Sequence, residues 1–431
     1  MVDTKIINDW VNNNKDYILE KLSELIKIKT INYGSHGDEK LGQEYIYNFI
    51  SKFLPKKDID IFEIDDVAGV RENSMFVGTI DGVERDYKNR PNMVAKLKGS
   101  GGGKSISFSG HIDIIPVMEE KWVTFEDPFS AKIKDGKMYG RGAIDMKGGI
   151  ISNFMALKCL KDLNLNLRGD VYAESIVDEE LGGVNGTIAT RLRYPNIDFS
   201  IITEPTALKA GIESRGGSVW KVTFTEDGPG GYSQTTNPIC KISEFVLFLE
   251  EFNEYRNSKE IYPVNFNGEK HLRLMELAVY AGGRDCLENA SYLPKIGKLY
   301  FLLHTRPNTS EEVLWGDFLD FMKKKIQKSK YLKNNFPKIE KAIRYFKGHS
   351  TALNHSGMTA LRNTYKNLKL DYVEQSMGYI CDAQGFSVGN TGVVVVVPTG
   401  DNIHGIDEYV DIDSVFKTIK ILVVTAINYC S

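Results

Sequence analysis

Short apolar runs alternate with helix-like segments through the first half of this chain, and no other feature constrains its fold as strongly. The runs "NMVAKL", "SISFSGHIDIIPV", "DVYAESIV" and "FSIITEP" are rich in apolar and β-branched residues and are short enough to be buried strands. Helix-like stretches such as "IISNFMALKCLKDL" lie between them. This alternation predicts an α/β domain in which helices flank a central, largely parallel sheet.

The chain is too long for a single core, and its pattern predicts two domains. At 431 residues it exceeds the size at which one hydrophobic core usually stops growing. Residues 213–349 have the pattern strand, helix, strand and helix of a small α+β unit, and the earlier pattern resumes near "HSGMTALRNTYKNL". We therefore expect a discontinuous larger domain, 1–212 and 350–431, into which the smaller domain 213–349 is inserted.

Charge and hydropathy exclude several classes of partner. The net charge is -3 with acids and bases interspersed, so no broad positive field would attract nucleic acid or an anionic membrane. No apolar run reaches the roughly 18 residues that would span a bilayer, and the start "MVDTKIINDW" lacks the apolar segment of a signal peptide. We expect a cytoplasmic protein whose partners are small molecules or peptides.

The cysteines argue against a disulfide framework and against a thiolate zinc site. They are scattered, odd in number and never in a C-x-x-C spacing. Their positions are Cys159, Cys240, Cys286, Cys381 and Cys430. Any metal ion in this protein would therefore be held by oxygen and nitrogen atoms.

Two polar residues interrupt one of the apolar runs. In "GHIDIIPV" His111 and Asp113 are two residues apart, and in a strand such residues emerge on the same face. A histidine and a carboxylate that point together past a wall of isoleucine and valine need polar partners. The pair therefore directs attention to other polar residues at the ends of strands.

Further polar residues stand where the other strands should end. Asp145 lies in a glycine-rich turn before a helix, the acids 178–180 end "SIVDEE", Glu204 ends "SIITE", and His404 lies in the loop after five valines. The carboxyl ends of strands in open α/β sheets face one crevice, where binding sites form. Two histidines and several acids without cysteine suit a divalent metal ion of the zinc, cobalt or manganese kind.

Each of these residues also has a purely structural interpretation. His111 and Asp113 could form a hydrogen-bonded pair in the core, and an acidic run such as 178–180 is commonly a solvated helix start. Asp145 could cap the helix that follows it, and His404 could be an ordinary loop residue. Their joint placement at strand ends, rather than any one residue, favours the metal site.

Five motifs, taken together and in order, resemble the M20 family of metal-dependent peptidases and deacylases. They are "GHIDIIP", "IKDGKMYGRGAIDMKGG", "DEELGG", "ITEPT" and "HGIDEYV". The family includes acetylornithine deacetylase, succinyl-diaminopimelate desuccinylase and carboxypeptidases. The resemblance implies a zinc-peptidase-like catalytic domain with a central mixed sheet flanked by helices. It also implies an inserted, ferredoxin-like lid domain through which two copies of the chain form a homodimer.

The resemblance further implies a centre of two divalent metal ions, of the zinc type or with cobalt or manganese in its place. His111 and Glu204 would hold one ion, and Glu180 and His404 the other. Asp145 would bridge them, since two cations roughly 3.5 to 4 Å apart need a shared carboxylate to screen their repulsion.

Two catalytic roles follow from the same resemblance. Asp113 would fix the orientation of His111. Glu179, which is next to a ligand but is not one itself, would act as the general base that takes a proton from water and hands it to the departing amine.

The chain departs from its relatives in the residues expected to bind substrate. Tyr232, in "GPGGYSQ", stands where relatives have a lid histidine, and a phenol can donate one hydrogen bond to an oxyanion but brings no positive charge. In "LLHTRPNTSEEV" we expect Arg306 to bind a substrate carboxylate because its fork suits that group, with His304 as the alternative. Asn289, in "ENASYLP", resembles a lid asparagine that approaches the site.

The function implied is hydrolysis of the amide bond of a small N-acyl amino acid or peptide, similar to the deacetylase and desuccinylase branch. A dipeptidase or carboxypeptidase on the same scaffold is the nearest alternative. The third interpretation is a catalytically weak relative that binds metal, because the lid histidine of the family is missing.

Overall fold

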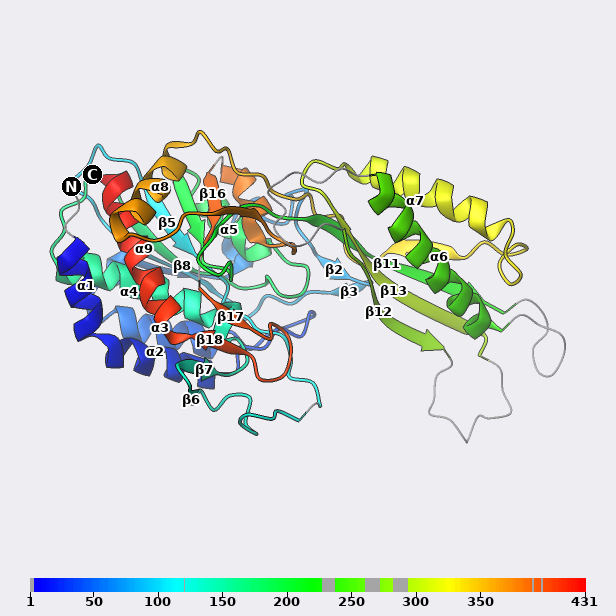
Figure 1. The fold of residues 1–431 in the computed structure, drawn as a ribbon, viewed down its shortest axis with the longest axis horizontal. Helices are drawn as coiled ribbons and strands as arrows, with labels where there is room; N and C mark the ends of the chain where they lie inside the picture. Colours follow the sequence, from blue (N-terminus) through cyan, green and yellow to red (C-terminus); the bar gives the residue numbers. More distant parts are fainter. Residues whose placement is uncertain are drawn as a thin grey trace.

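The computed structural model consists of a larger and a smaller lobe, and both chain termini lie in the larger one (Figure 1). The residues that it describes are 4–119, 121–226, 237–259, 272–281, 294–389, 391–396 and 398–431. The predicted sites Tyr232 and Asn289 lie outside these ranges. Among the described residues no helix combines the length and apolar character needed to cross a bilayer.

Three helices open the chain, as its apolar spacing indicates. They are α1 (Thr4–Asn13), α2 (Lys15–Lys27) and α3 (Lys40–Ile50). In α2 the buried residues Ile18, Leu22 and Leu25 recur at steps of four and three, so that one face packs on the larger lobe while the charged face stays in water.

An eight-stranded mixed sheet forms the centre of the larger lobe, which confirms the expected fold class. In spatial order its strands are β1 (Ile59–Phe62), β4 (Asn92–Leu97), β8 (Val171–Ser175), β5 (Ile106–Ser109), β9 (Phe199–Ile202), β16 (Gly392–Val395), β10 (Ala210–Glu213) and β15 (Glu374–Ser376). The four strands from β8 to β16 run parallel. The sheet is thus parallel only in its middle, because β4 pairs antiparallel with β8, and β10 with β16.

Helices flank this sheet and complete a continuous core. They are α4 (Gly148–Asp162), α5 (Asn185–Arg193), α8 (Ser356–Leu368) and α9 (Ile412–Cys430). The α9 helix packs against both α4 and α8. Buried strand residues such as Phe108 and Ile201 belong to the same hydrophobic cluster as these helices.

The structure corrects one detail of the sequence interpretation, close to a segment that joins two strands of the central sheet. The glycine-rich segment 99–105 joins β4 and β5, which do not pair with each other because β8 lies between them. The expected strand through "GHIDIIPV" ends at Ser109, and two isolated bridges follow it, His111 with Ile176 and Ile114 with Ile31. Its neighbours β8 and β9 also end at this level, so the regular ladder of the central sheet stops there.

The smaller lobe is a ferredoxin-like unit, as expected. Its elements are β11 (Gly216–Thr225), α6 (Pro238–Lys259), β12 (Leu274–Ala281), β13 (Ile296–Thr305), α7 (Glu311–Ile326) and β14 (Lys338–Lys341). The antiparallel order β12-β13-β11-β14 with two crossing helices is the topology of that fold. Its core is a separate cluster that includes Phe245, Phe301 and Phe318. The domain boundaries expected from the sequence stay a prediction.

Two smaller sheets lie outside the central sheet and the sheet of the smaller lobe. One has the order β17 (Gly400–Asp401), β18 (Tyr409–Asp411), β7 (Lys137–Tyr139) and β6 (Ile133–Lys134). The other is a hairpin of β2 (Thr79–Ile80) and β3 (Val83–Glu84), which lies between the two lobes (Figure 1).

Candidate metal centre

The polar residues singled out in the sequence meet at one edge of the central sheet. His111 follows β5, the acids 178–180 follow β8, and Glu204 follows β9. Because these strands are parallel, their carboxyl ends lie side by side. Asp145 reaches the same place from a short helical turn, η3 (Ala143–Lys147), and His404 from the loop between β17 and β18.

His111 is the buried centre of one group of acids. Its Nε2 lies 3.1 Å from Oδ1 of Asp145, 3.3 Å from Oε1 of Glu204 and 3.9 Å from Oε2 of Glu179. Its Nδ1 lies 2.9 Å from the backbone carbonyl oxygen of Asp113, which it can reach with its proton. That hydrogen bond leaves the lone pair of Nε2 directed at the carboxylates, the arrangement of a metal-ligating histidine.

His404 is the centre of a second group. Its Nε2 lies 2.8 Å from Oε2 of Glu180 and 3.2 Å from Oδ2 of Asp145. The two oxygens of Asp145 are thus divided between two histidines, with Oδ1 towards His111 and Oδ2 towards His404. The His404 side chain is 47% exposed, whereas that of Glu180 is 3% exposed, so the group opens to solvent on the His404 side.

The electrostatics of this cluster call for positive charge. Burial lowers the pKa of His111, but the facing carboxylates outweigh burial and raise that pKa well above its usual value. The carboxylates of Glu180 and Asp145 likewise raise the pKa of His404 to about 11 against the effect of burial. Burial raises the pKa of Glu180 to about 7. So many oxygen and nitrogen lone pairs at close range are stable only with cations among them.

The donor set fits divalent metal ions. Ligand atoms of His111, Glu179 and Glu204 all lie within 4.8 Å of one another, as do those of His111, Asp145 and Glu180. Imidazole nitrogen with carboxylate oxygen, and no thiolate, suits zinc, cobalt or manganese.

Asp113 supports this cluster through its backbone and its side chain. Its carboxylate accepts hydrogen bonds from the backbone N–H groups of Glu179 and Glu180, both at 3.1 Å, and from Nδ2 of Asn32 at 2.9 Å. The carboxylate itself lies 3.7 Å from Nδ1 of His111. Asp113 therefore orients His111 with its carbonyl oxygen and orients the acidic loop with its side chain.

Glu408 is a supporting residue that the sequence interpretation did not single out. Its buried carboxylate accepts hydrogen bonds from Arg141 at 2.7 Å and from the backbone N–H groups of Gly142 and Ile144 at 3.0 and 3.2 Å. It thereby joins the His404 loop to the turn that carries Asp145. Both motifs, "GRGAID" and "HGIDEY", are visible in the sequence, but nothing in the sequence alone pairs them.

The segment around residues 379–382 is a second element that was missed. The Tyr379 hydroxyl donates to the carbonyl oxygen of Pro205, next to Glu204, at 2.9 Å. Asp382 accepts a hydrogen bond from Thr187 at 2.9 Å, and burial raises its pKa to about 8. A tyrosine, an aspartate and a glutamine in the mostly apolar "GYICDAQGF" are the only signal that the sequence offers.

Of the residues expected to bind substrate, the structure describes His304 and Arg306, which lie in or next to the smaller lobe. His304 is in β13, 5% exposed, and Arg306 follows the strand end at Thr305 and is half-buried. Burial, together with the guanidinium groups of Arg215, Arg256 and Arg273, lowers the pKa of His304 to about 3. His304 is therefore neutral at physiological pH.

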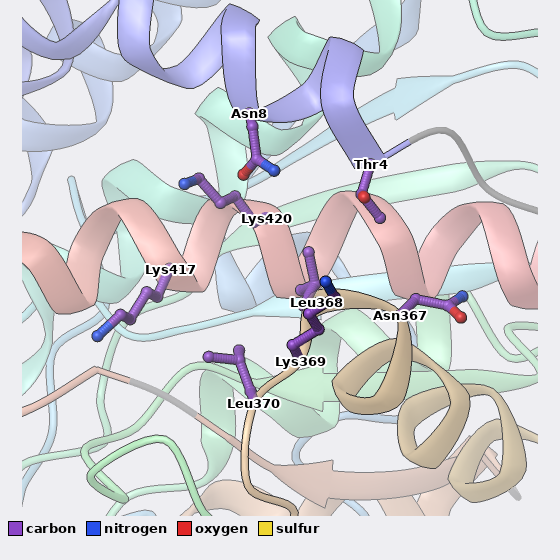
Figure 2. A pocket seen from close by; sticks show the side chains of 8 residues that line it. All are labelled: Thr4, Asn8, Asn367, Leu368, Lys369, Leu370, Lys417 and Lys420. Atoms are coloured by element: carbon purple, nitrogen blue, oxygen red, sulfur yellow. The ribbon is translucent and has the colours of Figure 1, made fainter.

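A cavity of about 340 Å³, drawn in Figure 2, shares no residue with this cluster. It is lined by parts of α1, α9 and the end of α8: Thr4, Asn8, Asn367, Leu368, Lys369, Leu370, Lys417 and Lys420. It contains lysines but neither histidine nor carboxylate, so this cavity has no ligand set for a divalent cation.

Comparison with known proteins identifies the family. Residues 107–428, more than half of the chain, match the model of peptidase family M20/M25/M40. The chain belongs to this family. It is therefore a metal-dependent hydrolase of amide bonds, as the sequence motifs indicate.

A deformylase with an established name aligns with most of the chain. N-formyl-4-amino-5-aminomethyl-2-methylpyrimidine deformylase of Bacillus subtilis (strain 168) is 27% identical over 380 residues, which cover 80% of this chain and 84% of the relative.

Two solved structures show the same fold. A dipeptidase from Saccharomyces cerevisiae has a TM-score of 0.74 at 16% identity and covers 99% of this chain and 98% of its own. A Bacillus subtilis protein described as a dinuclear metal-binding peptidase of the M20 family has a TM-score of 0.59 at 14% identity and covers 96% and 98%.

Proposed function

We propose that this M20 protein is a di-metal amidohydrolase that cleaves the amide bond of a small N-acyl amino acid or peptide. One observation carries the proposal: Asp145 has one oxygen 3.1 Å from Nε2 of His111 and the other 3.2 Å from Nε2 of His404. A carboxylate between two histidines, each with a glutamate of its own, is the ligand set that two neighbouring cations need.

The ligands divide between two ions. His111 and Glu204 would hold the first, Glu180 and His404 the second, and Asp145 would contact both. The nitrogen and oxygen donors favour zinc, with cobalt or manganese as alternatives. When bound, such ions supply Lewis-acid activation of water and of the amide carbonyl.

Glu179 is suited to move the proton in this reaction. Its Oε2 lies 3.9 Å from Nε2 of His111, at the edge of the ligand cluster, and Asp113 holds its backbone. Burial and the neighbouring Glu204 raise its pKa well above the ordinary value, so the carboxylate readily accepts a proton. We assign it the role of taking a proton from the attacking water at Oε2 and delivering it to the departing amine nitrogen.

Arg306 is the better partner for a substrate carboxylate than His304. His304 is buried and neutral, since its pKa is about 3, and a neutral imidazole cannot neutralise a carboxylate. The guanidinium group of an arginine such as Arg306 can form two parallel hydrogen bonds to a carboxylate. The roles of Tyr232 as oxyanion donor and of Asn289 as a lid contact stay predictions.

The likeness to a pyrimidine deformylase, over 80% of this chain, favours a second candidate substrate. An N-formyl amide has the smallest possible acyl group, and the same hydrolytic site would release formate and an amine from it. N-formyl derivatives of an aminomethylpyrimidine and of simple amino acids therefore belong in the substrate panel beside acetyl and succinyl amides and dipeptides.

The test is release of free amine from this panel by metal-loaded protein. We expect at least one N-acyl compound to be cleaved, with activity abolished by a chelator and restored by zinc, cobalt or manganese. Cleavage of dipeptides alone would move the assignment to the dipeptidase alternative. No release from any panel member by protein that retains its metal would leave a catalytically weak metal-binding relative and overturn the proposal.

A homodimer formed through the smaller lobe is the proposed assembly. β12 is the outermost strand of its sheet in the described residues, and its side chains Leu277, Val279 and Tyr280 are 48%, 57% and 51% exposed. An open strand edge with exposed apolar residues favours pairing with another chain. Sedimentation equilibrium should give twice the monomer mass, and Val279→Lys should shift it towards the monomer; a monomeric parent protein would exclude this assembly.

A further inference from the structure

The hairpin between the lobes has a tip whose backbone conformation is fixed. Thr79 pairs with Glu84 and Ile80 with Val83, which leaves Asp81 and Gly82 as a two-residue turn. Both turn residues have positive φ, 47° and 80°, and Asp-Gly is a preferred sequence for such a turn. The tip is therefore well defined by its own backbone, and it faces the smaller lobe (Figure 1).

Asp81 contacts three parts of the smaller lobe. Its Oδ1 accepts a charge-assisted hydrogen bond from Nζ of Lys221 in β11, and its Oδ2 accepts one from the hydroxyl of Tyr300 in β13 at 2.7 Å. Its backbone N–H donates to the carbonyl oxygen of Ala342, after β14, at 2.9 Å. Although burial acts in the opposite direction, these side-chain partners lower the pKa of Asp81, so the contact is ionic.

The chain that leaves the hairpin binds the acidic loop of the metal centre. Arg85, directly after β3, forms a fully buried ion pair with Asp178, and its Nε donates to the carbonyl oxygen of Gly34 at 3.0 Å. The hydroxyl of Tyr87 donates to the other oxygen of Asp178 at 2.8 Å. Asp178 also lies 3.5 Å from Nη2 of Arg90. Removal of one member of a buried ion pair is costly, so a displacement of Arg85 would disturb the contacts of Asp178.

Asp178 directly precedes the two acids of the candidate metal centre. Its φ of 76° is unusual for a residue other than glycine, and the side-chain contacts hold it there. Glu179 and Glu180 follow directly, with their N–H groups on Asp113. The loop also meets the smaller lobe at Gly182, where a Cβ would lie 3.0 Å from Ile343, the neighbour of the Ala342 that binds Asp81.

We propose that the β2–β3 hairpin couples the position of the smaller lobe to the acidic loop 178–180, with Asp81 as the contact to the lobe and Arg85 as the contact to the loop. Asp81 is thus a positioning residue for Glu179 and Glu180, although it belongs to neither the ligand set nor the proton path. The catalytic consequence rests on the proposed function, whereas the structural coupling does not.

Hydrogen–deuterium exchange on the full-length protein tests the coupling directly. The variants are Asp81→Ala, which removes the side-chain contacts, and Tyr300→Phe, which removes one hydroxyl in the other lobe. We expect Asp81→Ala to speed amide exchange in residues 176–184 by at least about tenfold, because it removes two charge-assisted hydrogen bonds and the loss of one accounts for roughly that factor. Tyr300→Phe should produce a smaller increase in the same peptide, and exchange in β4 should not change.

Glu84→Ala is the matched control, since this exposed residue lies on the same hairpin. It should leave exchange in residues 176–184 at the parent rate. Faster exchange in residues 79–84 with no change in 176–184 would overturn the proposal. So would an equal increase in β4, because that result would mean general destabilisation.

Kinetics provide the second measurement. With metal content unchanged, Asp81→Ala should lower kcat by roughly tenfold and leave KM nearly as it is, because the substrate contacts remain. A change in KM with kcat unchanged would overturn the positioning role. Absence of hydrolysis by the parent protein would count against the proposed function, and the exchange result would still decide the coupling.

Discussion

The backbone N–H of Glu179 donates a hydrogen bond to the carboxylate of Asp113 over 3.1 Å. The same carboxylate accepts the N–H of Glu180, while the carbonyl oxygen of Asp113 faces Nδ1 of His111. One buried residue therefore sets the orientation of the proposed general base and of one proposed ligand for each of the two proposed metal ions. The role of Asp113 requires that its carboxylate oxygens and its carbonyl oxygen all act as hydrogen-bond acceptors.

We expect Asp113→Asn to weaken the metal centre. The asparagine amide has one acceptor oxygen, so its NH₂ group would face an N–H of Glu179 or Glu180, and two donors repel. Loss of such an outer contact typically costs about 10-fold to 100-fold in metal affinity or activity. Metal titration and kcat should both change by this order, whereas Asp16→Asn, an exposed change in α2, should alter neither. Parent-like metal affinity and kcat in Asp113→Asn would show that the carboxylate is dispensable.

Glu179 and Glu180 are adjacent but should respond differently to the same substitution. Glu179→Gln should keep its metal and lose about 10² to 10⁴ in kcat, the contribution of a general base. Glu180→Gln should lose bound metal, because its Oε2 lies 2.8 Å from His404 in the second ligand group. Metal analysis and kcat on the same preparations separate the two effects. A fully active Glu179→Gln would remove its assigned role.

The sequence predicts the ligand cluster because strand ends are recognisable. His111 and Glu204 each follow a buried apolar run, and parallel strands bring such ends together whatever the detailed register. Strand direction was less accessible: β4 and β10 run antiparallel to their neighbours, and β8 inserts between β4 and β5. These pairings are decided by packing across the whole sheet, which short runs do not encode.

The contacts that Asp113 and Glu408 make around the metal centre could not be predicted from the sequence, because they involve backbone atoms. Asp113 acts on Glu179 through an N–H group, and Glu408 acts on the Asp145 turn in the same way. The directions of these groups depend on local φ values, such as 76° at Asp178 and 63° at His404. An aspartate or a histidine in a sequence does not by itself indicate a positive φ. The backbone groups that contact Asp113 and Glu408 could therefore not be predicted from the sequence.

Substitutions of Tyr232 test whether this residue takes over the role of the lid histidine that relatives have at its position. If its phenol is the oxyanion donor, Tyr232→Phe should lower kcat by about 10² to 10³, the usual effect of losing one donor. Tyr232→His should restore or increase kcat, because an imidazolium brings a charge as well as a hydrogen bond. Tyr255→Phe, at an exposed position of α6, is the control. Equal kcat values for Tyr232→Phe and the parent enzyme would mean that the donor lies elsewhere.

His304 should make the protein less stable in acid. Its pKa is about 3 in the folded state, lowered by burial and by nearby arginines, against 6.5 as the ordinary value. The neutral form is therefore favoured on folding, and the stability it contributes is complete above pH 6.5 and is lost as pH falls towards 3.

Removing this histidine should flatten the acid branch of the stability curve. At pH 4 the unfolded chain is protonated at this residue and the folded chain is not, so the penalty is about 3 kcal/mol at 1.36 kcal/mol per pKa unit. Urea unfolding at a series of pH values should show that His304→Gln loses less stability between pH 7 and pH 4 than the parent, by about this amount. The difference between the two proteins at pH 8, where the histidine is neutral in both states, is the baseline that corrects for lost packing. Parallel curves for the two proteins would mean that His304 becomes protonated without opposing the fold, and that the arginines around it do not hold it neutral.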